Sequence, residues 1–321
     1  MSDPHVDPES PSSGGDGPRF TVIIPTYNRS GMLAETLQSV FDQEFTDYEI
    51  LIVDDGSTDD TLESLAKLGD RVRVLQQQHK GCAAARNLGA REARGEYLAF
   101  LDDDDFWLPW TLAVFAEAIT RFDQPTFVAG NLTSFHDPDE VRQKQRDEPV
   151  FGGGPDYFAG ALEHGFALGV AHGVVRRDAY LAVGGCEERD INATDSDVLL
   201  KLGDLPGFAI VKQPVTLAYR QHTGSTTRNY DKGLAGMRML LEQDRRGAYP
   251  GGDERRPERM ANILSRTRGV CVGSSRRGRP DVAWRLYRET FAWNLRLGRF
   301  RFLLAMPLLI AQGWAMKLLG R

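Results

Sequence analysis

The sequence predicts an α/β fold, in which a sheet of mainly parallel strands carries helices on both faces, followed by a C-terminal helical region. Short apolar runs alternate four times with helical segments before position 102. This alternation is typical of βαβ units with right-handed crossovers, and therefore of a parallel sheet. After about position 226 the chain becomes rich in arginine and reads as helices. The sheet is therefore expected in the first two thirds of the chain.

Each predicted strand is an apolar run that ends at turn-forming or polar residues. The first four strands are expected at residues 20–24, 48–53, 72–76 and 97–101, with helices beginning near Ser30, Thr58 and Gly81. Further strands are expected at 126–133, 170–175, 208–211 and 215–219, and further helices at 109–122, 178–183 and 195–202. Residues 136–156 are polar and glycine-rich, which predicts a mobile loop.

Composition limits the class of protein and its compartment. The hydrophobic share of 41% and the charged share of 26% are those of a soluble globular protein, and the net charge of −6 argues against general nucleic-acid binding. The cysteines are few and lack metal-site spacing, which indicates a reducing compartment. They are Cys82, Cys186 and Cys271. No signal peptide is recognised, and the longest uncharged stretch, 302–316, is too short to span a membrane. A cytoplasmic location is therefore expected.

Four consecutive aspartates, Asp102 to Asp105, follow the fourth strand. In open α/β sheets the ligand crevice lies at the carboxyl ends of the strands. Four adjacent carboxylates raise the electrostatic energy there unless a cation binds. Mg²⁺ or Mn²⁺ would suit this oxygen cluster and would bridge it to a diphosphate. A solvated acidic loop is the other interpretation, because charge runs are usually solvated.

Polar and aromatic residues follow the other early strands. Tyr27 offers a ring that can stack on a base, Asp54 offers an acceptor for a base N–H or a ribose hydroxyl, and Arg86 can reach a phosphate or a base carbonyl. Each also has an ordinary interpretation, such as a turn at Asp55-Gly56 or a surface charge at Arg86. Together they favour a nucleotide-binding crevice.

This combination resembles the family 2 glycosyltransferases, which are inverting enzymes with the GT-A fold. The resemblance covers about residues 19–225. Four motifs carry it in order: VIIPTYNR at 22–29, IVDDGSTD at 52–59, ARNLG at 85–89 and GEYLAFLDDDD at 95–105. It implies a GT-A catalytic domain at 19–225. Residues 1–18, which are rich in proline, serine, glycine and aspartate, are expected to be a disordered tail, and residues 226–321, outside the resemblance, are expected to form a helical region.

The resemblance also implies roles for individual residues. The nucleotide-sugar would be bound by Pro25, Thr26, Tyr27, Arg29, Asp54, Arg86, Asp102 and Asp103. Asp104 would contact the divalent ion, Mn²⁺ or Mg²⁺, within a DxD-type motif whose register is ambiguous by one residue. His222, in the segment YRQHTGS at 219–225, would ligate the metal or touch the diphosphate, and Arg220 would neutralise charge on the leaving group. A lone histidine is more often structural.

A base is implied at Asp195, because Thr194-Asp195 matches the Glu-Asp pair that precedes a helix in this family. Thr194 replaces the usual glutamate, and Asp197 is the second candidate. The alternative is that Asp195 caps the helix while Asp197 favours its dipole.

The implied function is metal-dependent, inverting transfer of a sugar from a nucleotide-sugar to a hydroxyl of a saccharide or lipid-linked acceptor in polysaccharide biosynthesis. UDP-sugar is the first choice of donor, with GDP- and dTDP-sugars left open. A nucleotidyltransferase that makes a nucleotide-sugar is one alternative, but it predicts a glycine-rich, basic loop where residues 25–29 stand. A catalytically silent scaffold is the other, supported only by Thr194.

The C-terminal stretch 291–319 mixes aromatic and apolar residues with arginines. Such a helix can lie in a membrane interface, at the inner face of the membrane, and bring the enzyme to a lipid-linked acceptor. A tail helix packed on the catalytic domain, or a dimer contact, is the alternative. Pro307 is expected to break this stretch.

Overall fold

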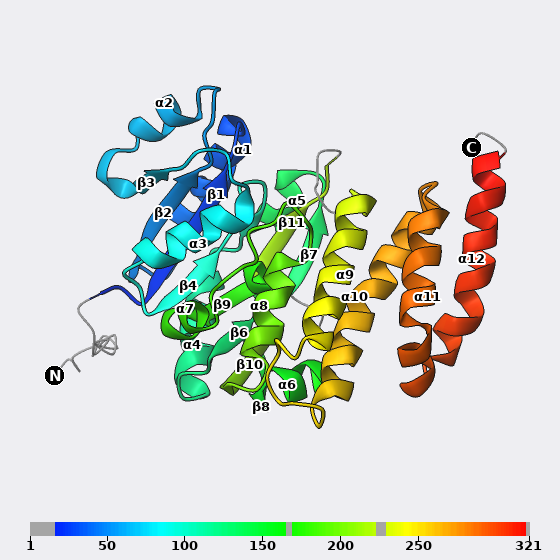
Figure 1. Ribbon diagram of the computed structural model, residues 1–321. Helices are drawn as coiled ribbons and strands as arrows, with labels where there is room; N and C mark the ends of the chain where they lie inside the picture. The colour runs from blue at the N-terminus through cyan, green and yellow to red at the C-terminus, as the bar shows by residue number, and fades with distance from the viewer. Residues whose placement is uncertain (1–16, 165–168, 223–228, 319–321) are drawn as a thin grey trace.

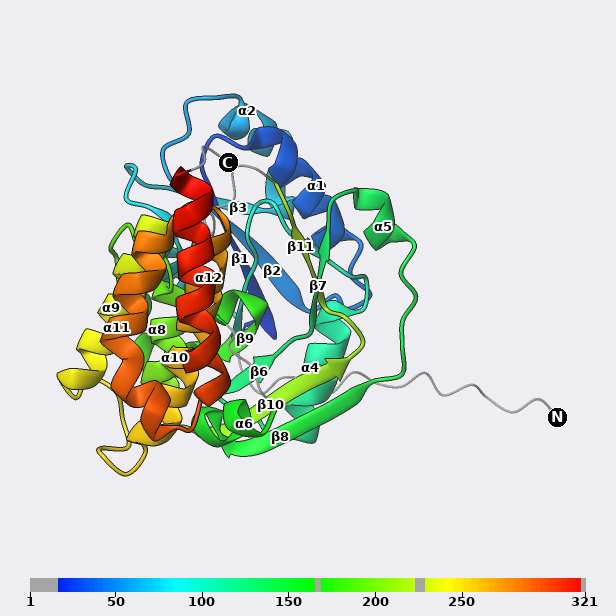
Figure 2. The ribbon, with the colours of Figure 1, turned by 90° about the vertical axis from the view of Figure 1, so that its right-hand side faces the viewer.

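The computed structural model describes residues 17–164, 169–222 and 229–318 (Figure 1). The tail expected at 1–18 falls almost wholly outside the described residues, as does the end of the segment 219–225. Two sheets occupy the N-terminal two thirds of the chain. In Figures 1 and 2 the helices α9 to α12 stand together on one side of the larger sheet. They are α9 (Tyr230–Arg245), α10 (Arg256–Arg276), α11 (Pro280–Arg296) and α12 (Phe300–Leu318).

The first four strands are parallel and adjacent, as the sequence predicts. They are β1 (Phe20–Thr26), β2 (Tyr48–Asp54), β3 (Arg73–Gln76) and β4 (Tyr97–Phe100), in the order β3-β2-β1-β4. The helices α1 (Ser30–Phe41), α2 (Thr61–Ala66) and α3 (Cys82–Glu92) connect them, with a 3₁₀ turn, η1 (Gly69–Arg71), before β3. Every residue of β1 is buried, as expected for a central strand covered on both faces.

Helices cover both faces of this sheet, which confirms the predicted fold class. Val22 and Ile24 point to one hydrophobic cluster, and Ile23 between them points to the other. This alternation follows from the two-residue period of a strand. The first cluster lies under α1 and α4 (Thr111–Arg121), and the second lies under α3, α6 (Tyr157–His164), α7 (Arg177–Ala182) and α8 (Thr194–Leu202).

The sheet is mixed beyond β4, so the parallel arrangement predicted from the first four strands does not extend through the whole sheet. β9 (Gly173–Arg176) runs antiparallel to both β4 and β6 (Phe127–Ala129), and β10 (Pro206–Gln213) is parallel to β6. The first residues of the strand expected at 170–175 form a 3₁₀ turn, η2 (Val170–His172).

The expectation of a loop over 136–156 was wrong in part. This segment contains α5 (Pro138–Arg142) and the edge strand β8 (Val150–Asp156), which pairs antiparallel with β10. The glycines that suggested a loop have a packing role. A Cβ on Gly153 would lie 2.4 Å from the ring of Phe122, so only glycine lets the strand approach this ring.

The strand expected at 126–133 is also two strands that belong to different sheets. β6 ends at Ala129, and β7 (Leu132–Phe135) joins a small sheet with β5 (Phe106–Trp107) and β11 (Leu217–Arg220), in the order β5-β11-β7. A Cβ on Gly130 would lie 2.3 Å from the Thr216 hydroxyl oxygen, and that hydroxyl bonds both the N–H and the carbonyl of Asn131. This close approach separates the two strands.

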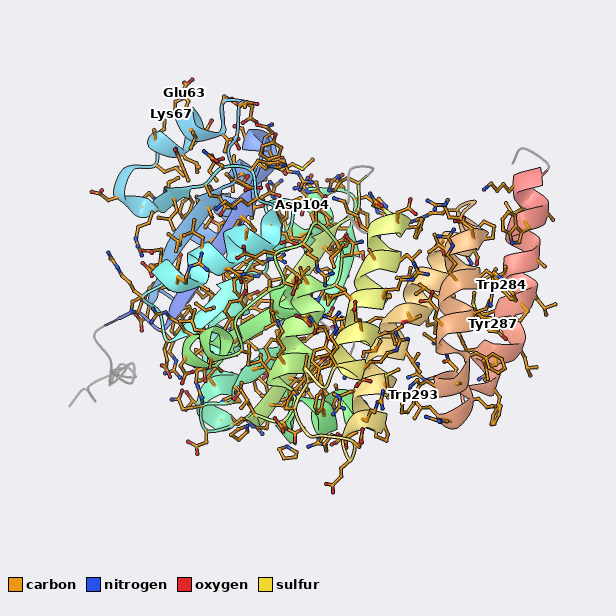
Figure 3. The ribbon with its side chains drawn as sticks, in the orientation of Figure 1. Glu63, Lys67, Asp104, Trp284, Tyr287 and Trp293 are labelled. Carbon is orange, nitrogen blue, oxygen red and sulfur yellow. The ribbon has the colours of Figure 1, made fainter. Side chains whose placement is uncertain are left out.

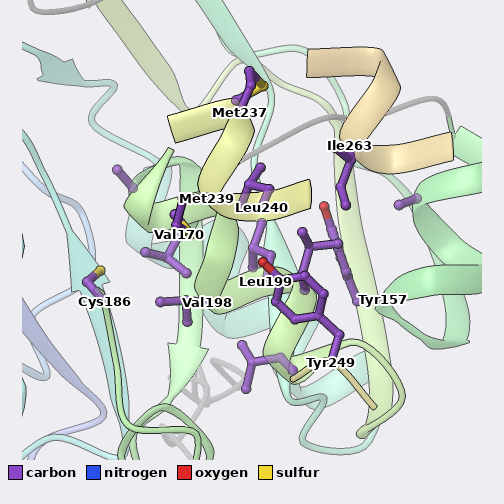
Figure 4. Packing of buried hydrophobic residues seen from close by; sticks show 14 of the residues in the cluster. Tyr157, Val170, Cys186, Val198, Leu199, Met237, Met239, Leu240, Tyr249 and Ile263 are labelled. Atoms are coloured by element: carbon purple, nitrogen blue, oxygen red, sulfur yellow. The ribbon is translucent and has the colours of Figure 1, made fainter. Parts of the chain in front are cut away.

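The C-terminal helices share a hydrophobic core with the sheet-bearing part. Figure 4 shows Met239 and Leu240 of α9 close to Val198 and Leu199 of α8, and Met237 of α9 and Ile263 of α10 belong to the same hydrophobic cluster. Tyr157 of α6 donates a hydrogen bond to Asn262 of α10 at 3.1 Å. The helices α9 and α10 therefore form a wall of the unit that carries the sheet. The domain boundary near 225 stays a prediction.

Pro307 lies inside α12, where the sequence suggested a break. A proline cannot donate to the carbonyl four residues earlier, which here is that of Leu303. The Tyr287 hydroxyl of α11 donates to the Leu303 carbonyl at 3.0 Å and replaces the missing donor. On the same face, a Cβ on Gly313 would lie 2.7 Å from the Ser275 carbonyl oxygen, so α12 packs tightly on α10. Within the described part of the chain, no helix is long and apolar enough to cross a membrane.

Replacing Tyr287 by phenylalanine is expected to lower the free energy of unfolding by about 1 kcal/mol, because the Leu303 carbonyl then has no donor. In a Pro307→Ala background the alanine N–H supplies that donor, so the same replacement should cost less than half as much. Urea unfolding of the four proteins measures both values. Equal losses in the two backgrounds would show that the hydroxyl does not compensate for Pro307.

Candidate functional site

The carboxyl ends of β1, β2 and β4 meet at one edge of the sheet. Thr26 is paired with Asp54 in the parallel register of β1 and β2, and β4 runs beside β1 and leads into Asp102. Figure 3 labels Asp104 in the upper centre of the view, away from Trp284 and Tyr287 of α11. The polar ends of three strands therefore lie together at this edge, which is where the sequence predicts a ligand crevice.

The four aspartates alternate in burial. Asp103 and Asp105 are buried, whereas Asp102 and Asp104 are only partly buried. Asp103 accepts hydrogen bonds from the Thr26 hydroxyl and from Arg29, each at 2.8 Å. Burial raises the pKa of Asp103 to about 6, although Arg29 and Thr26 act to lower it. Asp103 is therefore a structural link between the ends of β4 and β1.

Asp105 binds the backbone at the end of β11 in the small sheet. Its carboxylate accepts a hydrogen bond from the Arg220 backbone N–H at 2.9 Å, and burial together with Asp102 and Asp104 raises its pKa well above the usual range. Asp103 and Asp105 thus face inward, and the side chains left toward the crevice are those of Asp102 and Asp104.

The pairing of β5 with β11 brings His222 to the acidic block. The two strands are antiparallel, with Ala218 opposite Phe106, so the residues after Ala218 run back along those before Phe106. The Arg220 guanidinium donates to the Asp104 carbonyl at 2.9 Å and stacks over the Phe106 ring at 4.8 Å. His222 Nε2 lies 2.8 Å from Asp104 Oδ2. Residues more than 100 positions apart are therefore neighbours.

Asp104 and His222 fit a divalent ion that takes few ligands from the protein. Their donor atoms are one carboxylate oxygen and one imidazole nitrogen in contact, and Arg29 also contacts the Asp104 carboxylate at 2.7 Å. Among the described residues no group of three or more His, Cys, Asp or Glu side chains is placed to hold a metal. Mg²⁺ in phosphate-binding sites commonly uses one or two carboxylates, with phosphate oxygens and water completing its shell.

Arg86 is buried at the N-terminal end of α3 and pairs with Asp102. Its Nε is buried and has no hydrogen-bond partner among the described residues. A buried donor without a partner is costly, and a ligand oxygen would satisfy it. The sequence interpretation of Arg86 as a solvated surface charge is therefore wrong.

The remaining residues of the predicted nucleotide site differ in exposure. Tyr27 is 39% exposed, and its ring packs on that of His79 with centroids 4.1 Å apart. Asp54 is buried and accepts from the Ser57 N–H at 3.2 Å, which closes the turn after β2. Pro25 is buried within β1. No motif of the sequence predicts that His79 packs on Tyr27.

Asp195 lies in the first turn of α8, and the N-cap of that helix is Ala193 in a left-handed conformation. Its carboxylate accepts from the Ser196 N–H at 2.8 Å. A Cβ on Gly169 would lie 1.5 Å from Asp195 Oδ2, so the backbone at 169 presses against this carboxylate. Burial alone would raise the pKa of Asp195, but Arg86, Arg266 and His172 outweigh it and hold the pKa below its usual value.

Arg266 of α10 also belongs to this environment. It contacts the Ser196 hydroxyl oxygen and lies 3.3 Å from the Tyr157 hydroxyl oxygen. The sequence did not single out Arg266 or Tyr157, because neither lies in one of the four motifs. The part of the crevice around Asp195 is thus completed by a helix from the C-terminal region.

The second candidate, Asp197, is fully buried on the same helix. It accepts a hydrogen bond from the Tyr249 hydroxyl at 2.7 Å and forms an ion pair with Lys201 at 2.7 Å. These partners come from α8 itself and from the chain after α9. Asp197 therefore fastens α8 to the helical region.

Part of this chain is similar to known glycosyltransferases. Residues 21–178 match the family model described as glycosyl transferase family 2. An uncharacterised glycosyltransferase of Rickettsia felis is 48% identical over 91 residues, which are 28% of this chain and 15% of that protein. A Campylobacter jejuni protein named GalNAc(5)-diNAcBac-PP-undecaprenol beta-1,3-glucosyltransferase is 41% identical over 101 residues, which are 30% of this chain and 33% of that protein. The aligned part is thus a third or less of these relatives' own length.

Solved structures show the same fold at low sequence identity. TarS 1–349 of S. aureus, in complex with UDP-GlcNAc, aligns with a TM-score of 0.55 at 17% identity over 87% of this chain and 92% of that one. The mannosyltransferase PcManGT of Pyrobaculum calidifontis, in complex with GDP-Man and Mn²⁺, aligns with a TM-score of 0.54 at 19% identity over 94% and 87%.

Replacing Arg29 by glutamine is expected to move the pKa of Asp103 above its value of about 6, because the cation that favours the carboxylate is removed. Carbon NMR of the side-chain carboxyl, followed against pH, measures this shift. Arg19→Gln is the matched control, since Arg19 pairs with Glu96 at the other end of β1. An unchanged titration in Arg29→Gln would mean that Arg29 does not stabilise the buried carboxylate.

Proposed function

We propose that this chain, a glycosyltransferase of family 2 with the GT-A fold, moves a sugar from a nucleotide-sugar to a hydroxyl of a saccharide or lipid-linked acceptor, with inversion at the anomeric carbon. UDP-sugar is the proposed donor. The observation that carries the proposal is the position of Arg86, which pairs with Asp102 and also lowers the pKa of Asp195. The acidic block and the proposed base therefore act within one crevice.

Three features support a nucleotide at the carboxyl ends of the first strands. The partly exposed Tyr27 ring offers a stacking surface, Asp54 offers carboxylate oxygens, and Arg86 Nε offers a buried donor that has no partner among the described residues. We assign the base and ribose to Tyr27 and Asp54, together with Pro25 and Thr26 at the end of β1. Arg29 and Arg86 would face phosphate or ribose oxygens.

The alternation in burial supports one register of the acidic motif. Asp103 and Asp105 are engaged inward by Thr26, Arg29 and Arg220, so we assign the contacts with the nucleotide-sugar and the metal to Asp102 and Asp104. Asp103 then acts by holding the strand end. Asp104 and His222 would hold the divalent ion, Mn²⁺ or Mg²⁺, which when bound would stabilise charge on the leaving diphosphate.

Asp195 would act as the general base. Its lowered pKa keeps it ionised at neutral pH, so the carboxylate can accept the proton of the acceptor hydroxyl. As the proton moves to Asp195, the acceptor oxygen forms a bond to the anomeric carbon. The bond between that carbon and the diphosphate oxygen breaks with its electron pair going to the diphosphate. One displacement of this kind inverts the configuration.

Contact with a membrane surface through residues 291–319 is part of this proposal, since a lipid-linked acceptor would be reached there. The large exposed apolar side chains of α11 and α12 support it. They are Trp284, Phe291, Leu295, Phe300, Leu304, Leu308, Trp314 and Met316. An enzyme on the cytoplasmic face of a membrane would fit this arrangement.

Calorimetric titration with UDP, GDP and dTDP, each with and without Mn²⁺, tests the donor and metal assignments. One nucleotide, expected to be UDP, should bind in a Mn²⁺-dependent way. Asp104→Asn should weaken that binding at least about tenfold, because the ion loses a charged ligand. Asp195→Asn should keep the binding and lower transfer by about 10²- to 10⁴-fold. Absence of binding by all three nucleotides would contradict the donor assignment, and an active Asp195→Asn enzyme would contradict the base.

Gly169→Ala is expected to lower transfer by about 100-fold while nucleotide binding is kept, because its methyl group would displace the Asp195 carboxylate. The φ of −99° at this position suits alanine, so the effect is steric. Gly269→Ala is the matched control, since nothing lies within 4 Å of a Cβ at that position of α10. Equal activity of both variants would show that Asp195 need not stay where the structure has it.

A further inference from the structure

We propose that the groove between α10 and α12 binds the phosphate-bearing headgroup of an anionic membrane lipid, while the exposed apolar stripe of α12 enters the bilayer interface. The proposal deepens the membrane contact proposed above and rests on it. The groove has a volume of about 930 Å³. It lies in the C-terminal helices, and none of the residues assigned to the nucleotide or to catalysis lines it.

Four arginines line this groove and no acidic residue does. They are Arg268 and Arg276 on α10, Arg299 in the turn before α12, and Arg301 on α12. Arg268, Arg276 and Arg301 are exposed and have no ion-pair partner in the part of the chain that the structure describes. Unpaired guanidinium groups that converge on one groove attract a phosphate, which they can bind through several N–H groups at once.

Arg299 shows that the cations in the groove affect one another. Its guanidinium is half-buried and donates to the Ala261 carbonyl at 2.8 Å. Burial and the neighbouring Arg268 lower the pKa of Arg299, as expected for like charges held close together. An anion in the groove would relieve this repulsion.

The floor of the groove and the outer face of α12 are apolar. Phe302, Met306 and Leu309 line the groove beside the arginines. Leu304 and Leu308, four residues apart, are 75% and 74% exposed, and Phe300 one turn earlier is 57% exposed. The opposite face of α12 is buried against α10 and α11 by Leu303, Met306 and Ile310. Leu308 also lines the groove, so the exposed leucine stripe borders the groove and is available to lipid.

The distribution of charge over the chain favours an anionic membrane as the occupant. Residues 256–321 contain 14 basic and 3 acidic residues, in a chain whose net charge is −6. The helical region is thus strongly positive, and the rest of the chain is negative. A basic patch beside an exposed apolar stripe is the combination that anionic lipid surfaces attract. An acidic soluble protein as the occupant would account for the arginines of the groove but not for the exposed leucine stripe of α12.

Sedimentation of the full chain with lipid vesicles tests the proposal. Vesicles of phosphatidylcholine containing about one third phosphatidylglycerol should bind the protein, and vesicles of phosphatidylcholine alone should bind it at least about tenfold more weakly. Replacing Arg268 and Arg301 together by glutamine should weaken partition about 30-fold, since each arginine near an anionic surface contributes about one factor of five. Replacing Leu304 and Leu308 by glutamine should also weaken it, without disturbing the buried face of α12.

Arg91→Gln combined with Arg245→Gln is the matched control, because both arginines are exposed and neither lines the groove. Equal weakening by the control pair and the groove pair would overturn the groove as the site and leave only general charge attraction. Failure of the protein to bind anionic vesicles would overturn the proposal altogether. The Mn²⁺-dependent nucleotide titration is repeated on each variant, and unchanged nucleotide binding shows that loss of lipid binding is separate from the proposed catalytic site.

Discussion

The arrangement of the crevice depends on neutralising four adjacent carboxylates at the end of one strand. Two of them are turned inward and bonded by Thr26, Arg29 and the Arg220 backbone, which fixes the end of β4 against β1 and β11. Because the inward pair is held in this way, the other two, Asp102 and Asp104, project into the crevice. Arg29, Arg86 and His222 contact that outward pair. These contacts offset the electrostatic cost of gathering like charges. They also position the side chains that are proposed to contact the nucleotide-sugar and the metal.

Sequence reasoning could predict the part of the molecule that is organised locally. The first four strands and their parallel order follow from apolar runs and short connections, and the structure confirms them. The contact of Arg86 with Asp102 was not predicted, although both residues were expected at the nucleotide crevice. The family assignment rested on the same stretch, which is the part that the family model matches.

The rest depended on contacts between distant segments that have no local signature. The three glycines before Pro155 suggested a loop. They lie instead in the edge strand β8, where Phe122 and Gly160 occupy the space that a Cβ would fill. Arg266 and Tyr249 approach α8 from beyond position 245, outside any motif. Pro307 suggested a break, but a hydroxyl from a neighbouring helix completes the bonding of α12. In each case the deciding contact comes from another element of the fold.

The position of Arg266 on α10 has a consequence for how such an enzyme can change. Apart from β11 with Arg220 and the following His222, the elements at the proposed nucleotide edge all lie before position 108, whereas those around Asp195 come from η2, α6, α8 and α10. The proposed nucleotide side and the side around Asp195 are therefore encoded mainly in separate stretches of the chain. On the proposed assignment, substitutions around Asp195 would remodel the acceptor side while the first four strands stay intact, so one specificity would vary without rebuilding the other.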